Sequence, residues 1–185
     1  MGKIILVTGG ARSGKSSFAE RLALKLGGGR AAYIATAQIF DDEMAYRIKI
    51  HQKRRGTNWT TYEAPFNAEE MISTAAADFG AILFDCVTIY VSNFLCAADL
   101  DDEAELYKNL REMIQRLIDA ALSSDAVIIF VTNEVGGGIV PENKLARRFR
   151  DLAGLANQML AAKADKVFLT VAGIAIDVKR LEEKF

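Results

Sequence analysis

The stretch TGGARSGKS, residues 8–16, decides the fold of this chain. It follows the apolar run IILV at residues 4–7 and opens an amphipathic stretch that begins at Ser17. Strand, glycine-rich loop and helix therefore follow one another, which is the context that the phosphate-binding pattern G-x-x-x-x-G-K-[ST] requires. The glycines let backbone N–H groups turn toward an anion, and the dipole of the new helix adds positive potential there.

This loop offers a group for each part of a bound nucleoside triphosphate. Lys15 can reach the β- and γ-phosphates, and the hydroxyl of Ser16 can bind Mg²⁺. The candidate nucleotide-binding residues of the loop are Gly9, Gly10, Ala11, Arg12, Ser13, Gly14, Lys15 and Ser16. A purely structural turn is the alternative, but the flanking strand and helix favour the nucleotide site.

Composition and charge indicate one cytoplasmic domain, residues 1–185. Hydrophobic residues make up 51% of the chain, which is enough for a sizeable core. The formal net charge of −1 gives no overall attraction to nucleic acid or to a membrane surface, and the sequence suggests no membrane span and no secretory leader. The two cysteines, Cys86 and Cys96, form no disulfide framework, and we expect Cys86 to be buried.

Short β-rich runs alternate with longer helical patterns along the chain. We expect strands at residues 3–8, 31–36, 59–63, 81–85, 126–132 and 166–171. We expect helices at residues 14–26, 42–54, 68–78, 88–97, 103–123 and 142–164. This alternation predicts an α/β, P-loop NTPase-like fold with a mostly parallel central sheet flanked by helices. Residues 173–179 are a possible C-terminal antiparallel strand.

The only histidine of the chain lies in a basic helical pattern. Arg47, His51 and Arg55 are spaced four residues apart and so share one helix face. An imidazole among cations tends to stay neutral, and the neutral form is nucleophilic, while the cations could hold phosphate oxygens. On charge alone, however, the pattern fits a solvated helix face better than a catalytic site.

Polar residues end three of the expected strands. Asp85 closes the apolar run AILFD, as the Mg²⁺-binding carboxylate of a P-loop protein does, although it could instead cap the next helix. Glu63 ends another strand and, taken alone, fits an ordinary surface carboxylate. The tract VTNEVGGGIVPEN, residues 131–143, suits an active-site rim and a plain connecting loop equally well.

Together these tracts resemble the bifunctional adenosylcobinamide kinase / adenosylcobinamide-phosphate guanylyltransferase family of cobalamin biosynthesis. The match covers nearly the whole chain in order and rests most on TNEVG and on RFRDLAG, residues 148–154. The other matching tracts are GGARSGKS (9–16), YIATA (33–37), DDEM to His51 (41–51), Trp59, DCVT (85–88), IVPEN (139–143) and NQ (157–158).

The resemblance implies two reactions and assigns residues to them. It implies phosphorylation of adenosylcobinamide with ATP or GTP, followed by transfer of GMP from GTP to adenosylcobinamide phosphate, with Mg²⁺, in a homotrimer. It makes His51 the residue that carries GMP, with Lys15 as the second catalytic residue and Ser16 and Asp85 at the metal. It also implies nucleotide contacts from Ala35, Thr36, Ala37, Gln52, Lys53, Arg54, Arg55, Glu63 and Asp85.

Two other functions remain open on the sequence. The chain could be a different P-loop small-molecule kinase in which His51 is structural, or a nucleotide-binding regulator without catalysis. Residues 136–141 and 88–93 are the candidates for corrinoid contact.

Overall fold

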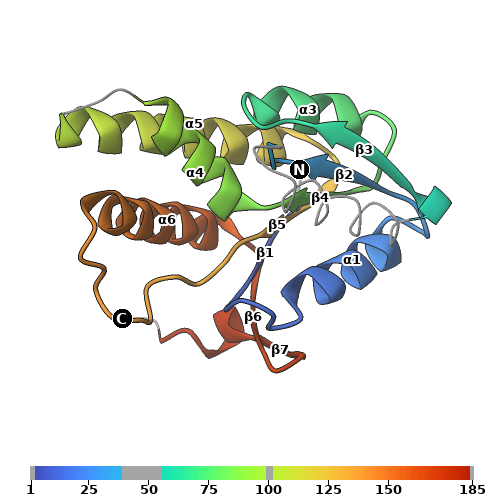
Figure 1. Ribbon diagram of the computed structural model, residues 1–185. Coiled ribbons are helices and arrows are strands. Elements are labelled where there is room, and N and C mark those ends of the chain that lie inside the picture. Colours follow the sequence, from blue (N-terminus) through green and yellow to red (C-terminus); the bar gives the residue numbers. More distant parts are fainter. Residues whose placement is uncertain (1–2, 39–55, 99–101, 184–185) are drawn as a thin grey trace.

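The computed structural model describes residues 3–38, 56–98 and 102–183. These residues form a seven-stranded sheet with helices on both faces (Figure 1). The strands are β1 (Lys3–Gly9), β2 (Ala31–Ala35), β3 (Trp59–Glu63), β4 (Ala81–Asp85), β5 (Val127–Val131), β6 (Lys166–Val171) and β7 (Ile174–Asp177). The helices are α1 (Lys15–Leu26), α3 (Ala68–Ala76), α4 (Val87–Ala97), α5 (Glu103–Ser123) and α6 (Lys144–Lys163), with short 3-10 turns at Gly56–Asn58 and Val178–Leu181.

The sheet is parallel except at one edge. Its strand order is β3-β2-β4-β5-β1-β6-β7, and only the pairing of β6 with β7 is antiparallel among the described strands. The predicted α/β architecture, including the antiparallel C-terminal strand, is confirmed. The helix expected at residues 42–54 lies outside the described residues.

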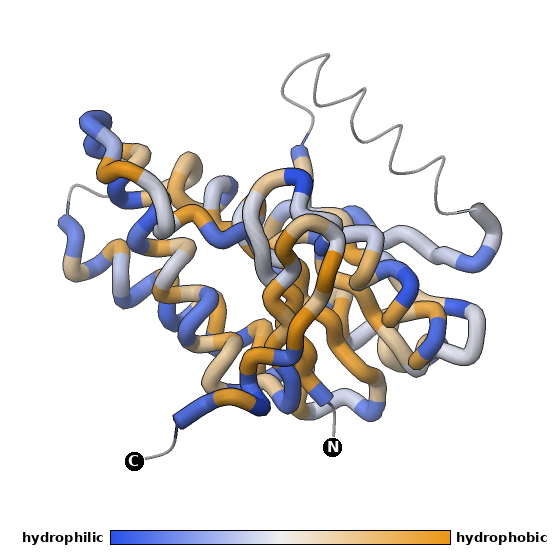
Figure 2. The backbone as a smooth tube through the Cα atoms, turned by 90° about the horizontal axis from the view of Figure 1, so that it is seen from below, coloured by the Kyte–Doolittle hydropathy of each residue, from blue (hydrophilic) through white to orange (hydrophobic). Residues whose placement is uncertain are grey.

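Alternate residues of the strands supply two cores, one on each face of the sheet. Ile82, Phe84 and Phe130 belong to the face that α3, α4, α5 and α6 cover, and Leu83 and Val131 belong to the face that α1 covers. The inner strands β1, β4 and β5 are mainly hydrophobic along their length, and orange segments fill the middle of the molecule in Figure 2, because helices bury both faces of these strands. None of the described helices is both long and apolar enough to cross a membrane.

The strand register brings the predicted site residues to one edge of the sheet. Ala35 at the end of β2 pairs with Glu63 of β3 and with Asp85 of β4. Val131 at the end of β5 pairs with Asp85 on one side and with Val7 of β1 on the other. Because β1 to β6 are parallel, their carboxyl ends lie at the same end of the sheet, where the glycine-rich loop leaves β1.

Candidate active site

The glycine-rich loop joins β1 to α1 and requires glycine at Gly14. Gly14 is the N-cap of α1 and has φ of 94°, a left-handed conformation that glycine adopts without strain. A Cβ at this position would lie only 3.0 Å from the Cα of Gly173. The first backbone N–H groups of α1 are therefore left for a ligand, since no side chain caps the helix.

The loop is held in place by the hairpin formed by β6 and β7. The hydroxyls of Ser13 and Thr170 are hydrogen-bonded at 2.8 Å, and the backbone N–H of Gly173 donates to the carbonyl of Ser13 at 2.8 Å. A Cβ on Gly9 would approach the carbonyl oxygen of Thr170 to 2.5 Å, so the loop and hairpin can pack this closely only with glycine there. These contacts fix the loop before any nucleotide arrives.

Lys15 is buried at the start of α1, with 9% of its surface exposed. Its ammonium group donates to the carbonyl of Gly10 at 3.1 Å and so lies folded over the loop. Burial lowers the pKa of Lys15, and the negative charge of Asp85 partly offsets that effect. The charges of Lys15 and Asp85 therefore interact, although β5 lies between β1, which leads to Lys15, and β4, which ends at Asp85.

Asp85 faces the site and does not cap α4. The hydroxyl of Tyr33 donates to Asp85 Oδ2 at 3.0 Å, whereas the N-cap of α4 is Cys86, with no side-chain capping bond. The capping alternative is therefore not what the structure shows. With the half-buried hydroxyl of Ser16, the carboxylate offers the oxygen ligands that Mg²⁺ prefers.

Replacing Asp85 with asparagine tests the metal role. We expect nucleotide turnover to need a higher Mg²⁺ concentration, because asparagine keeps the shape of the side chain but removes the negative charge. Titration of MgCl₂ at fixed GTP measures the shift, and Tyr33→Phe is the matched control, since it removes the hydrogen bond to the carboxylate but keeps the carboxylate's charge. A titration curve that coincides with that of the unmodified protein would remove Asp85 from the metal site.

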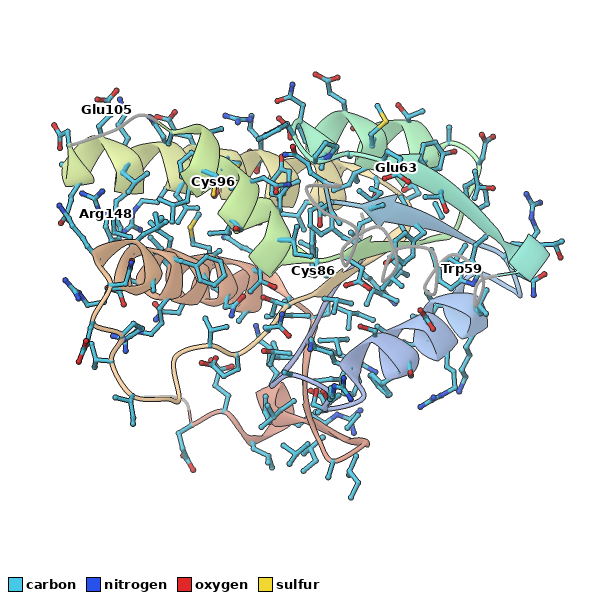
Figure 3. All side chains as sticks on the ribbon, in the orientation of Figure 1. Trp59, Glu63, Cys86, Cys96, Glu105 and Arg148 are labelled. Carbon is cyan, nitrogen blue, oxygen red and sulfur yellow. The ribbon has the colours of Figure 1, made fainter. Side chains whose placement is uncertain are left out.

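The ends of β2 and β3 contribute differently from what the sequence suggests. Thr36 is fully buried, and its hydroxyl both donates to the carbonyl of Cys86 at 2.9 Å and accepts from the Cys86 N–H at 2.8 Å. Its side chain therefore fastens β2 to β4, and a nucleotide contact by this hydroxyl stays a prediction. Ala35 and Ala37 on either side are half-buried, and Glu63 is exposed at the neighbouring strand end. Trp59 and Glu63 mark the two ends of β3 in Figure 3.

Cys86 lies under this site as a buried thiol, as expected. Burial raises the pKa of Cys86 to about 11, with a further contribution from Asp85, and its sulfur lies 3.1 Å from the hydroxyl of Thr88. The thiol is therefore protonated at neutral pH and is no candidate nucleophile.

Alkylation should separate the two cysteines. At pH 8 in native conditions we expect iodoacetamide to modify the exposed Cys96 and to leave the buried, protonated Cys86 unmodified. Peptide mass spectrometry measures this, with the denatured protein as the control in which both react. Equal modification of the native protein at the two positions would contradict the buried environment of Cys86.

The comparisons with known proteins show the family of this chain. The family model described as cobinamide kinase / cobinamide phosphate guanyltransferase matches residues 5–178, which include the glycine-rich loop, Asp85 and both tracts around α6. The chain belongs to this family. As a cobinamide kinase / cobinamide phosphate guanyltransferase, it is an enzyme with two transferase activities.

Curated relatives support membership in the cobinamide kinase / cobinamide phosphate guanyltransferase family. The bifunctional adenosylcobalamin biosynthesis protein CobU of Salmonella typhimurium is 47% identical over 95% of this chain and 99% of its own length. The protein of the same name from Escherichia coli is 46% identical, and CobP of Pseudomonas aeruginosa is 40% identical over 94% of this chain and 96% of its own. Among solved structures, the RadB recombinase matches 90% of this chain and 73% of its own with a TM-score of 0.48 and 14% identity.

Several predicted residues of this cobinamide kinase / cobinamide phosphate guanyltransferase lie outside the described part of the chain. They are Arg47, His51, Gln52, Lys53, Arg54 and Arg55. The last described residue before them, Gln38, follows β2 at the carboxyl edge of the sheet. The roles of these residues stay predictions.

Sequence reasoning missed the hydrogen bonds that hold the end of β5. The hydroxyl of Thr132 donates to Asn157 Oδ1 at 2.7 Å, Asn157 Nδ2 donates to the carbonyl of Asn133 at 3.3 Å, and Asn133 Nδ2 donates to the hydroxyl of Thr88 at 3.1 Å. Thr88 and Asn93 are buried inside α4, so the corrinoid contact suggested for residues 88–93 has little free side-chain surface. A local pattern carries no signal for such pairs, because Thr132 and Asn157 are 25 residues apart.

Proposed function

We propose that both transferase reactions use the nucleotide cleft at the carboxyl edge of the sheet. The observation that carries this proposal is that the buried ammonium of Lys15 and the carboxylate of Asp85 interact electrostatically. Lys15 is also the first residue of α1, whose first backbone N–H groups have no side-chain cap. Residues 9–16, with Ala35, Thr36, Ala37, Glu63 and Asp85, would hold ATP or GTP there. Gln52, Lys53, Arg54 and Arg55 would add contacts to the nucleotide, and Arg47, Lys53, Arg54 and Arg55 would bind its phosphates.

In the first reaction, the hydroxyl of the aminopropanol arm of adenosylcobinamide attacks the γ-phosphorus of the nucleotide. The bond from that phosphorus to the bridging oxygen breaks, and the nucleoside diphosphate leaves. The loop amides and Lys15 stabilise the charge that spreads over the transferring phosphoryl group. Ser16 and Asp85 would hold Mg²⁺, which when bound neutralises the phosphate oxygens.

In the second reaction, the neutral imidazole of His51 attacks the α-phosphorus of GTP and expels pyrophosphate. A phosphate oxygen of adenosylcobinamide phosphate then attacks the same phosphorus, and the histidine leaves. The product is adenosylcobinamide-GDP. A covalent intermediate replaces one displacement between two anions with two easier steps.

The proposed setting is a cytoplasmic homotrimer in which residues 1–185 of each copy act as one domain. The cytoplasmic setting and the trimer rest on the sequence and on its family resemblance, and the single sheet of the described residues supports one domain. Neither nucleic acid nor a membrane is a proposed partner.

The first test is incubation of the purified protein with Mg²⁺ and GTP labelled in the α-phosphate. We expect a covalent GMP adduct that intact mass detects, that peptide mapping places on His51, and that acid releases but base does not. GTP labelled in the γ-phosphate is the control and should leave no label on the protein. Bound GTP without an adduct would instead favour a simple P-loop kinase, and bound nucleotide without any product from cobinamide would favour a regulator.

A further inference from the structure

A hollow of about 630 Å³ lies between α5, α6 and the loop that follows β5. Its volume is in the range of pockets that enclose whole small-molecule ligands. Its walls come from residues 136–140 and from the α6 segment 150–158. Neither segment has a role in the proposed binding of the nucleotide. The salt bridge between Arg148 and Glu103, at 3.3 Å, joins the N-terminal parts of α6 and α5, and Arg148 is labelled in Figure 3.

One wall of the hollow begins at the nucleotide loop. The backbone N–H of Glu134 donates to the carbonyl of Gly9, in the nucleotide loop, at 3.1 Å. Gly136, the first residue that lines the hollow on this side, follows only two residues later. At its far end the wall is held by Arg147, which donates to the carbonyl of Pro141 at 3.0 Å. Between these anchors Ile139 is 97% exposed. A ligand in the hollow can therefore extend one arm along the wall toward the phosphates.

The lining mixes hydrogen-bond donors and acceptors over a partly apolar base. Arg150 lies 3.5 Å from the carboxylate of Asp151, and Gln158 supplies both an amide donor and an acceptor. Burial, together with the carboxylates of Asp151 and Glu103, raises the pKa of Tyr107, so its hydroxyl stays protonated and can donate. Val140 and Leu155 line the same hollow with apolar surface.

Glycines leave the surface of the hollow flat. Gly154 on α6 and Gly138 in the loop both line it, and a Cβ built on either residue would meet no atom within 4 Å. Nothing in the described fold requires glycine at position 154, where the backbone is helical and glycine is less favourable than alanine. The open space instead lets a broad ligand rest against the backbone of α6.

We infer that this hollow binds the corrin ring of the acceptor substrate. The inference rests on the proposed function, which requires a corrinoid whose aminopropanol arm reaches the nucleotide. A corrin is a broad, largely apolar ring fringed with carboxamides, each of which both donates and accepts hydrogen bonds. The mixed lining and flat glycine surface match that chemistry, whereas the carboxylate of Asp151 beside Arg150 disfavours a second phosphate group.

Filling the hollow tests the inference. Gly154→Phe places a ring in the open space, and Gly154→Ala is the control that also replaces the helical glycine but leaves the space open. Since the block removes contacts along the whole ring, we expect the KM for cobinamide in the kinase reaction to rise by at least about tenfold in Gly154→Phe. In both variants we expect the KM for GTP and the formation of the GMP adduct from GTP alone to be unchanged.

A second variant tests the polar lining without adding bulk. Arg150→Gln should raise the KM for cobinamide about tenfold, as the loss of a charged hydrogen bond does, while Arg21→Gln on the exposed surface of α1 should not change it.

The outcomes separate this inference from the proposed function. An unchanged KM for cobinamide in Gly154→Phe overturns the inference alone. A changed sedimentation velocity in that variant, with all constants altered together, also overturns it and makes the hollow a contact between copies of the chain. If the unmodified protein neither phosphorylates cobinamide nor forms the GMP adduct, the proposed function itself fails.

Discussion

Replacement of His51 with alanine is expected to lower guanylyl transfer by at least about four orders of magnitude, as the loss of a covalent nucleophile does in other enzymes. Phosphorylation of adenosylcobinamide should survive in the same variant, because no step of γ-phosphoryl transfer passes through an imidazole. The measurement is a pair of assays on one preparation, with cobinamide phosphate formed from γ-labelled GTP and the GDP-linked product formed from α-labelled GTP.

The surviving kinase activity is the control for folding in this experiment, since it needs the same nucleotide loop. Guanylyl transfer at a substantial rate in His51→Ala would show that GMP travels by another route. Loss of both activities in a variant whose circular dichroism spectrum matches that of the unmodified protein would mean that the segment around His51 also serves the first reaction, and the proposed separation of the two reactions would be wrong.

Removal of the Lys15 ammonium is expected to impair both reactions. Turnover with GTP should fall by roughly two to three orders of magnitude in Lys15→Ala, the usual loss when a preorganised charge is removed from a transition state. The effect is large because Lys15 is buried, and a charge in a dry site acts more strongly on the phosphates than one in water. Lys25→Ala, an exposed position in the last turn of the same helix, is the matched control.

Replacement of Lys15 should not lower the stability of the protein in the absence of nucleotide. Burial lowers the pKa of Lys15, so the protonated side chain costs folding free energy at pH values below its folded pKa. That cost declines as pH rises through the folded pKa toward the ordinary value of the unfolded chain. At pH 7 we therefore expect Lys15→Met to melt no lower than the unmodified protein, and to gain nothing from added GTP. A variant that GTP still stabilises fully would refute the role of Lys15 in binding.

The periodicity of the sequence predicted the fold closely, for a physical reason. The segments 59–63, 81–85 and 166–171 were expected as strands and are β3, β4 and β6 with the same bounds. Each is a short run that is rich in β-branched, aromatic or aliphatic residues and lies between turn-forming or polar ones, and of the three only β4 is buried along nearly its whole length. The helix α6 is two residues shorter at its start than expected, because Asn143 accepts a hydrogen bond from the N–H of Ala146 and thereby caps the helix.

Much of the site could not be read from local patterns. Asp85 was predicted from its place at a strand end, but its partner Tyr33 is 52 residues away. Thr36 was assigned to the nucleotide by resemblance, yet its hydroxyl is engaged with the backbone of Cys86, 50 residues along the chain. Such pairs arise when strand register brings distant residues together, which the order of residues along one segment does not encode.

The hydrogen bonds between the nucleotide loop and the β6–β7 hairpin determine when, during its own synthesis on the ribosome, the chain can first bind nucleotide. Ser13 and Thr170 are separated by 157 residues, so the loop is translated early and acquires its brace only after β6 and the turn at Gly173 have left the ribosome. A nascent chain that has not reached this point carries the phosphate-binding sequence without the contacts that shape it. Ability to bind nucleotide would thus mark a chain that has been synthesised beyond Gly173 and distinguish it from shorter fragments.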